Sequence, residues 1–431
     1  MRLELGTFPV AELRFGSETR LDGARLTVDR DAVRRLVAED LTFSRVDVEI
    51  VRPGEACRVI HVADTVEPRI KVAGPGAIFP GTLGPLENVG AGRTHRLSGV
   101  AVLSSVEFPW RRVGGVILPT EAIVDMSGPM AAYTPFSETL NLVLVLDLQP
   151  DLTDEEYERA VRLAGLKVAA YLAECTRHLP PPRVDVLDLT VQDPSLPRVV
   201  YVWQIYSLET YGGQYWYGLR LDNLFPTLIH PNEVVDGALV SGQHTAPNVK
   251  HCTWLNQNNA VIEGLYQAHG RDFNFAGVIL VRGRYTTVEE KQRVANQAAK
   301  LAGLLAADGA LVTWESSGNA QMDAILIVQA CERAGIKTVF LTTEYGGHEG
   351  TDVPLIYHVP ELDAIVSTGS VDQRVAFPPM PRAVGGATVR LRPEVGGIRQ
   401  SATAAIVPDR RTELYCSGHQ LGTGRITCLE Y

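Results

Sequence analysis

Alternating apolar and polar residues in the first part of the chain predict short β-strands. The alternation is clearest in Arg25–Asp29, Val46–Val51 and Arg58–Val62, and glycine and proline punctuate these segments. Residues 74–92 are rich in glycine and proline and predict a long loop. From Leu152 to Leu172 the apolar residues follow helical spacing behind an acidic first turn, which predicts an amphipathic helix.

After residue 195 the pattern changes to strands that alternate with helices. Strands are expected at Val199–Tyr206, Gly277–Val281, Ala310–Thr313, Thr338–Thr342 and Ala364–Ser367, and helices at Val288–Ala306 and Met322–Ala334. Such units with short connections predict a parallel sheet. We therefore expect an α/β fold (α+β overall): an N-terminal mixed, mostly β domain at 1–195, an α/β domain at 196–395, and a C-terminal tail at 396–431 packed on the body.

Two polar loops follow predicted strands of this sheet, at 314–319 and at 344–350. Ligands of open parallel sheets bind beyond the carboxyl ends of the strands, so these loops are candidate site elements. The alternative is that they only cap the following helices. Their polar side chains supply three catalytic candidates, Glu315, Glu344 and His348. They also supply two candidates for substrate binding, Asn319 and Tyr345.

Composition narrows the class of protein. The chain has 431 residues, 45% of them hydrophobic, and a formal net charge of −10 without clustered Lys or Arg, which argues against nucleic acid or an anionic membrane as partner. No signal peptide and no membrane-spanning apolar run is visible in the sequence. The six cysteines are scattered without a CxxC pair, as expected of reduced thiols, so we expect a cytoplasmic protein.

Short stretches along the whole chain resemble one known family. In chain order they are Met1-Arg2-Leu3-Glu4-Leu5-Gly6, Arg52-Pro53-Gly54-Glu55, Gly92-Arg93-Thr94-His95, Asp125-Met126-Ser127-Gly128-Pro129, Tyr133-Thr134-Pro135-Phe136-Ser137, Pro226-Thr227-Leu228-Ile229, Asp236-Gly237-Ala238-Leu239-Val240-Ser241-Gly242, Asn258-Asn259, His269-Gly270-Arg271-Asp272-Phe273-Asn274-Phe275 and Gln420-Leu421-Gly422. Each alone is weak, but together and in this order the chain resembles the proprotein of glycine/sarcosine/betaine reductase component B, a family related to the D-proline reductase proprotein.

The resemblance implies a self-cleavage site just after Ser241-Gly242. The family's proprotein cuts itself before a cysteine at this place, and that cysteine becomes the pyruvoyl group that condenses with the substrate amine. A thiolate can attack the preceding carbonyl and then leave by β-elimination. This chain has Gln243-His244 where the resemblance places Asn-Cys, and an imidazole bonded to Cβ through carbon cannot leave. We therefore expect no pyruvoyl group and no cleavage here. Relocation of the reaction to Cys252 would require the loop to be rebuilt.

Other chemistry must then replace the pyruvoyl group. One hypothesis is a zinc or other divalent-metal site formed by His244, Cys252 and His348, although the spacing matches no standard zinc pattern. A metal-free alternative makes His244 a general base partnered by Glu315 or Glu344. The third possibility is that these are ordinary polar loop residues.

Two further residues are candidate contacts to the substrate. Gln243 adjoins the expected cleavage position, and Arg93 could bind a carboxylate with two hydrogen bonds or merely anchor its loop. We expect the ligand between the loops at 314–319 and 344–350, with segment 243–252 closing over it, so that His244, Glu344 and His348 converge.

Three functions remain open at this point. The first is an enzyme that acts at a C–N bond of a small amine or amino-acid derivative without a pyruvoyl group, an inference by analogy. The second is a non-catalytic subunit of a multi-subunit complex, and the third is a true reductase subunit of the amino-acid reductase type. The expected partners are a small-molecule substrate and either a partner subunit or further copies of the chain.

Overall fold

We describe the fold from a computed structural model of the chain. The residues described are 1–109, 111–113, 116–118, 120–190, 192–208, 212–244, 246–315, 318–349, 351–391, 399–408, 411–418 and 420–421. Among them, none of the helices combines the length and the apolar character that a membrane crossing requires.

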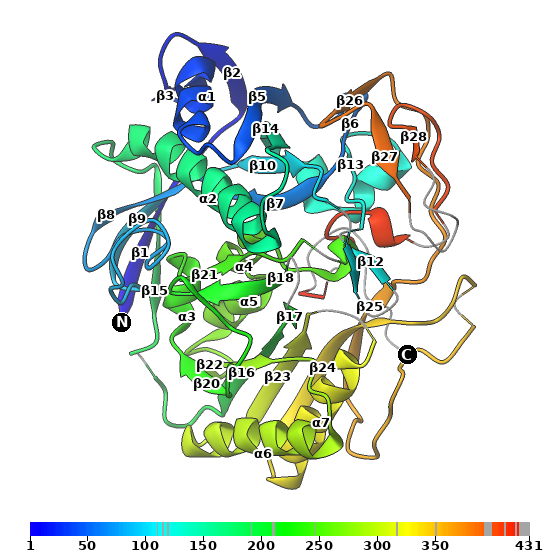
Figure 1. Cartoon of the computed structure of the whole chain (residues 1–431). Helices are drawn as coiled ribbons and strands as arrows, with labels where there is room; N and C mark the ends of the chain where they lie inside the picture. Colours follow the sequence, from blue (N-terminus) through cyan, green and yellow to red (C-terminus); the bar gives the residue numbers. More distant parts are fainter. Residues whose placement is uncertain are drawn as a thin grey trace.

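Two four-stranded sheets form most of the N-terminal half (Figure 1). Their strand orders are β15-β1-β9-β8 and β5-β14-β10-β7. The strands are β1 (Arg2–Pro9), β5 (Phe43–Val51), β7 (Val62–Val66), β8 (Arg69–Ala73), β9 (Gly92–Ser98), β10 (Val100–Val106), β14 (Leu140–Leu148) and β15 (Arg183–Asp188). A smaller unit at the edge contains β2 (Glu12–Gly16), β3 (Arg20–Asp22), β4 (Arg25–Asp29) and helix α1 (Arg30–Ala38).

Helix α2 (Asp154–Ala173) lies across the N-terminal sheets and covers strands β7, β8 and β10. Its start is fixed by a capping box, in which the Thr153 hydroxyl accepts a hydrogen bond from the Glu156 amide and the Glu156 carboxylate accepts one from the Thr153 amide. Its buried face joins strands β5, β10 and β14 in one apolar core. The helix predicted from the sequence is therefore confirmed, and it packs where its apolar face predicts.

A six-stranded sheet organises the C-terminal half, with the order β20-β22-β16-β23-β24-β25. The strands are β16 (Arg198–Ile205), β20 (Thr227–Ile229), β22 (Asn274–Arg282), β23 (Gly309–Trp314), β24 (Lys337–Glu344) and β25 (Ile365–Ser370). All pairs are parallel except β20 with β22. Helices α6 (Val288–Leu304) and α7 (Ala320–Arg333) cover one face. The α/β class is confirmed, and every strand and helix expected after residue 195 is present.

The opposite face of this sheet lies against the N-terminal half. Because side chains alternate along a strand, Val200 and Val202 of β16 pack under the helices, whereas Tyr201 and Trp203 enter a core shared with N-terminal strands. Figure 1 shows the connecting elements between the halves: β18 (Gly212–Trp216), β19 (Leu219–Arg220), β21 (Leu239–Ser241) and helices α3 (Pro231–Val235), α4 (Thr253–Gln257) and α5 (Ala260–Ala268).

The end of the chain returns to the N-terminal half. Strand β26 (Arg382–Val384) pairs in parallel with β6 (Cys57–Val59), and β6 also pairs with β13 (Val124–Asp125). After β26, strands β27 (Thr388–Arg390) and β28 (Arg399–Ser401) pair antiparallel beside these strands. Sheet pairing thus connects residues on both sides of the expected boundary near 195, a connection that the local pattern did not indicate.

Candidate functional site

The segment at which the sequence predicts the altered cleavage site lies in the interior. Gln243 is 0% exposed and His244 is 5% exposed. Strand β21, directly before them, pairs antiparallel with β18, and this pairing fixes the direction in which the segment leaves the sheet. At Gly242 an added Cβ would lie 2.3 Å from a Glu158 carboxylate oxygen, so a larger residue here would displace the Glu158 side chain.

Strand β7 holds the segment from the other side. The Ala63 carbonyl accepts hydrogen bonds from His244 Nδ1 at 3.1 Å and from Lys250 Nζ at 2.5 Å. The neighbouring Asp64 carboxylate accepts hydrogen bonds from the Thr253 amide at 3.0 Å and the Thr253 hydroxyl at 2.6 Å. Segment 243–253 is therefore tied to β7 at two successive residues.

His244 is an uncharged imidazole with one nitrogen that lacks a partner. A carbonyl can only accept, so Nδ1 carries the hydrogen and Nε2 carries the lone pair. Nε2 is buried and has no hydrogen-bond partner among the residues described. Burial and the nearby charge of Lys250 place the pKa of His244 well below its usual range. Its ring stacks on Phe108, with 4.7 Å between centroids.

The Gln243 carbonyl accepts a hydrogen bond from Lys250 Nζ. Lys250 itself is 2% exposed. The Gln243 side-chain amide is buried, and neither its oxygen nor its nitrogen has a partner among the described residues. An ammonium ion therefore polarises the carbonyl of the 243–244 peptide bond.

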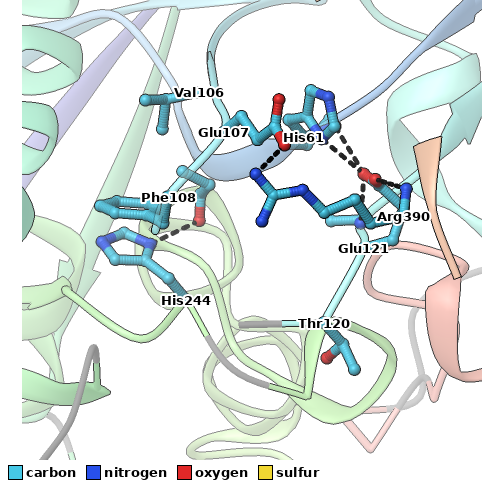
Figure 2. Close-up of a pocket in the computed structure, with 11 residues that line it drawn as sticks. His61, Val106, Glu107, Phe108, Thr120, Glu121, His244 and Arg390 are labelled. Atoms are coloured by element: carbon cyan, nitrogen blue, oxygen red, sulfur yellow. Dashed lines mark hydrogen bonds and ion pairs between the residues drawn. The ribbon is translucent and has the colours of Figure 1, made fainter. Parts of the chain in front are cut away.

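His244 lines a small pocket with a volume of about 30 Å³. Figure 2 shows the side chains around it, which come from separated parts of the chain: His61, Glu107, Phe108, Thr120, Glu121, His244 and Arg390. Arg390 extends across the view toward the Phe108–His244 stack and forms an ion pair with Glu107. The volume accommodates a group of a few heavy atoms, such as the polar end of a small ligand.

A histidine–glutamate pair lies on the far side of this pocket. His61 Nδ1 lies 3.0 Å from Glu121 Oε1. Burial opposes charge on His61, but the attraction and hydrogen bond of Glu121 outweigh it and raise the pKa of His61. Burial likewise opposes charge on Glu121, yet the His61 side chain and the backbone amides of Arg390 and His61 lower the pKa of Glu121. The pocket therefore faces a charge-favouring His61 and a neutral His244.

Glu315, which follows β23, contacts the 243–252 segment at His251. Its carboxylate accepts hydrogen bonds from the amides of His251 at 2.8 Å and Tyr206 at 3.0 Å, and from Gln214 Nε2 at 3.1 Å. It is fully buried, and burial raises the pKa of Glu315 to about 7. The pocket of His244 does not include it.

The other sheet-end candidates lie elsewhere. Glu344 ends β24, where its carbonyl accepts the Val371 amide, and His348 Nδ1 contacts the Asp372 carbonyl at 3.0 Å. The Tyr345 hydroxyl accepts the Gly318 amide, and Asn319 is exposed at the start of α7 without a side-chain cap. None of these four side chains lines the His244 pocket.

Arg93 and Cys252 are accounted for by local contacts. Arg93 Nε donates to Glu4 at 2.8 Å across the β1–β9 pair. Cys252 is fully buried at the start of α4 beside Cys416. Within the described ranges no group of three or more His, Cys, Asp or Glu side chains could hold a metal ion, so the metal hypothesis gains no support from the geometry.

Sequence reasoning missed the residues that share the pocket with His244. His61, Glu107, Glu121 and Arg390 form no motif, and more than half of the chain separates the first from the last. One signal in the sequence was present, because His61 interrupts an apolar strand pattern. The structure adds that its backbone has a φ of 54°. A strained residue of this kind often marks a functional position.

The fold and this interior segment define an α/β protein with a buried histidine at the place of a predicted processing site. The family model described as "Glycine/sarcosine/betaine reductase component B subunits" matches residues 1–429, and the chain belongs to this family. It is 36% identical over 391 residues to the glycine reductase complex component B subunits alpha and beta of Acetoanaerobium sticklandii, with 89% of each chain covered.

Two relatives from Peptoclostridium acidaminophilum are similarly close. The sarcosine reductase complex component B subunit alpha is 37% identical over 391 residues, with 89% of each chain covered. The betaine reductase complex component B subunit alpha is 37% identical over 397 residues, covering 89% of this chain and 88% of the relative. No solved structure matches the chain.

The residues at the position where the resemblance places the processing site do not fit formation of a pyruvoyl group. His244 is joined to its backbone through a carbon–carbon bond that offers no leaving group, and its Nδ1 is bound to Ala63. The carbonyl that would be attacked does have an electrophilic partner in Lys250. The segment thus retains polarisation of the peptide bond and lacks the nucleophile.

Proposed function

We propose that this chain is an uncleaved member of the component B family that binds a small amine or amino-acid derivative and acts at its C–N bond without a pyruvoyl group. The observation that carries the proposal is His244. It stands where the resemblance places the family's processing cysteine, is buried and lines a pocket. Its Nε2 has no hydrogen-bond partner among the residues that the structure describes.

The roles of the residues follow from their protonation states. The Nδ1 bond to Ala63 fixes the tautomer of His244 and leaves the lone pair on the buried Nε2. In this proposal that lone pair accepts a proton from a bound amine. Lys250 and Ala63 position the imidazole and the preceding peptide. Phe108 covers one face of the ring and excludes water from it.

The pocket has room for one polar end of a small ligand and not for a whole substrate molecule. Glycine, sarcosine and betaine, after which the related complexes are named, are small and share a carboxylate and a nitrogen centre. The names also describe components of complexes, and on this basis we propose a partner subunit for this chain.

A second candidate function is a non-catalytic subunit of such a complex. It is favoured by one observation: Glu315, the sheet-end carboxylate nearest the processing segment, is saturated with hydrogen bonds from Tyr206, Gln214 and His251 and holds the segment in place. A true reductase subunit is the third candidate, and it would require the pyruvoyl chemistry that His244 does not fit.

The test combines intact mass spectrometry with an assay of amine release. Intact mass spectrometry should give a single species near 47.0 kDa. Glycine, sarcosine and betaine should each be incubated with the protein and a dithiol reductant, and released amine measured. Amine release by wild type that is lost in His244→Ala supports the enzyme. Amine release by neither protein, with the mass intact, supports the non-catalytic subunit. Two fragments that separate at residue 243 would overturn the proposal.

A further inference from the structure

The pocket beside His244 contains two groups that can carry positive charge, each in contact with its own carboxylate. Glu121 fixes His61, and Glu107 contacts Arg390. These pairs come from the loop between β6 and β7, the end of β10, the chain before β13, and β27. Figure 2 shows Arg390 and His61 on the same side of the pocket, opposite the Phe108–His244 stack.

Glu121 behaves as a fixed negative charge behind His61. Its Oε1 accepts the amides of His61 at 2.9 Å and Ala122 at 3.0 Å, and its Oε2 accepts the amide of Arg390 at 2.9 Å. These bonds, added to His61 Nδ1, occupy the carboxylate and hold the imidazole in one orientation. Because Nδ1 of His61 contacts Glu121, Nε2 is the ring nitrogen left to contact another group.

A glycine, Gly386, lies beside that nitrogen. An added Cβ at Gly386 would lie 3.3 Å from His61 Nε2, tighter than an ordinary contact. The backbone of His61 itself is strained, with a φ of 54°. A conformation of this kind costs free energy and persists where the surroundings enforce it, as Glu121 does here.

We propose that His61 and Arg390 form a binding site for the carboxylate of a small ligand in this pocket. The site rests on the proposed function, because it assigns residues to one end of the ligand that His244 would meet. An imidazolium N–H and a planar guanidinium are suited to two carboxylate oxygens. Thr120, whose buried hydroxyl has no partner among the described residues, adds a further donor.

The geometry favours a carboxylate over a larger anion. A pocket of about 30 Å³ holds a group of about two or three heavy atoms and leaves little room for a phosphate ester. The carboxylate could belong to a simple acid or to an amino acid. Acetate, glycine and ethylamine separate these sources, because they carry the carboxylate alone, the carboxylate with an amine, and the amine alone.

Binding should weaken as pH rises. The charged groups that face His61 are Glu121, Glu107 and Arg390; the first two favour its protonated form and Arg390 opposes it. His244, on the opposite wall, stays neutral. Since the pKa of His61 is raised, the imidazolium persists to a higher pH than in a free histidine, and affinity is lost as pH rises through that raised pKa.

The experiment is calorimetric titration of acetate, glycine and ethylamine into wild type and His61→Asn over a series of pH values. Asparagine tolerates the left-handed backbone of position 61, and His178→Asn, at an exposed histidine, is the matched control. Acetate should bind wild type and the control, weaken with rising pH, and bind His61→Asn at least about tenfold less tightly without that pH dependence. Ethylamine alone should not show this dependence.

Glu121→Gln supplies a second readout that does not depend on removal of the imidazole. Without the fixed negative charge the pKa of His61 falls, so the pH midpoint of acetate binding should move down while binding at low pH survives. Equal acetate affinity in wild type and His61→Asn, or no acetate binding by folded wild type, would overturn the proposal. Acetate binding without amine release would remove the proposed enzyme function and leave this site standing.

Discussion

Replacing Glu315 with glutamine should remove a pH dependence that this buried carboxyl gives to the stability of the fold. Burial raises the pKa of Glu315 to about 7 from its ordinary value of 4.5. Between these two values the folded protein keeps a proton that the unfolded chain has released, so the free energy of unfolding falls as pH rises. Glutamine cannot ionise and carries no such dependence.

The magnitude follows from the shift in pKa. A difference of about 2.5 units at about 1.4 kcal/mol per unit gives about 3 kcal/mol, fully present below pH 4.5 and lost above pH 7. Near pH 5 the protonated carboxyl and the amide are similar in shape and polarity, so the two proteins should differ little. Near pH 8 the variant should have gained about 3 kcal/mol relative to wild type.

The assay is urea unfolding of both proteins at several pH values, followed by tryptophan fluorescence. Trp203 is a nearby reporter, because its indole donates to His251 Nδ1 at 3.3 Å and the His251 amide contacts Glu315. Glu349→Gln, at an exposed position, is the control and should follow wild type. If the stability of wild type relative to Glu315→Gln is independent of pH, Glu315 is not the desolvated acid that its surroundings indicate.

Three further predictions concern cleavage, stability and metal content. In the His244→Cys variant a thiol stands beside the carbonyl that Lys250 contacts, so intact mass spectrometry should detect partial cleavage after residue 243. The cleavage should be absent from the double variant that also carries Lys250→Met. An uncleaved His244→Cys protein would show that more than the nucleophile is missing. Asp125→Asn leaves the fully buried Arg58 without its anionic partner, so urea titration should show the free energy of unfolding lowered by about 3–5 kcal/mol. Asp185→Asn, in a largely exposed ion pair, is the control and should change the free energy of unfolding by less than about 1 kcal/mol. Equal effects of the two substitutions would contradict this account. Inductively coupled plasma mass spectrometry should find substoichiometric metal in both wild type and His244→Ala, because no cluster of described residues offers three metal ligands. Stoichiometric metal in wild type alone would support the metal hypothesis.

The sequence by itself determined the local elements and the family. Helical spacing behind a capping box is a property of consecutive residues, so helix α2 was predicted within a few residues of its bounds. Short apolar strands that alternate with helices likewise specify a parallel sheet, because each helix carries the chain back so that the next strand runs in the same direction. The unusual Gln243-His244 pair was also visible from residue order alone.

Only the tertiary structure decided which side chains meet. Topology led us to place the ligand beyond the ends of β23 and β24, yet the pocket of His244 opens toward strands β7 and β10 instead. The cause is the return of the chain at β26 and β27, which brings Arg390 beside His61 and Glu121. Contacts between residues hundreds of positions apart depend on how whole sheets pack, and hydrophobic periodicity carries no information about that packing. The charge on His61 and the neutrality of His244 follow from the same packing, because burial and neighbouring charges set both pKa values.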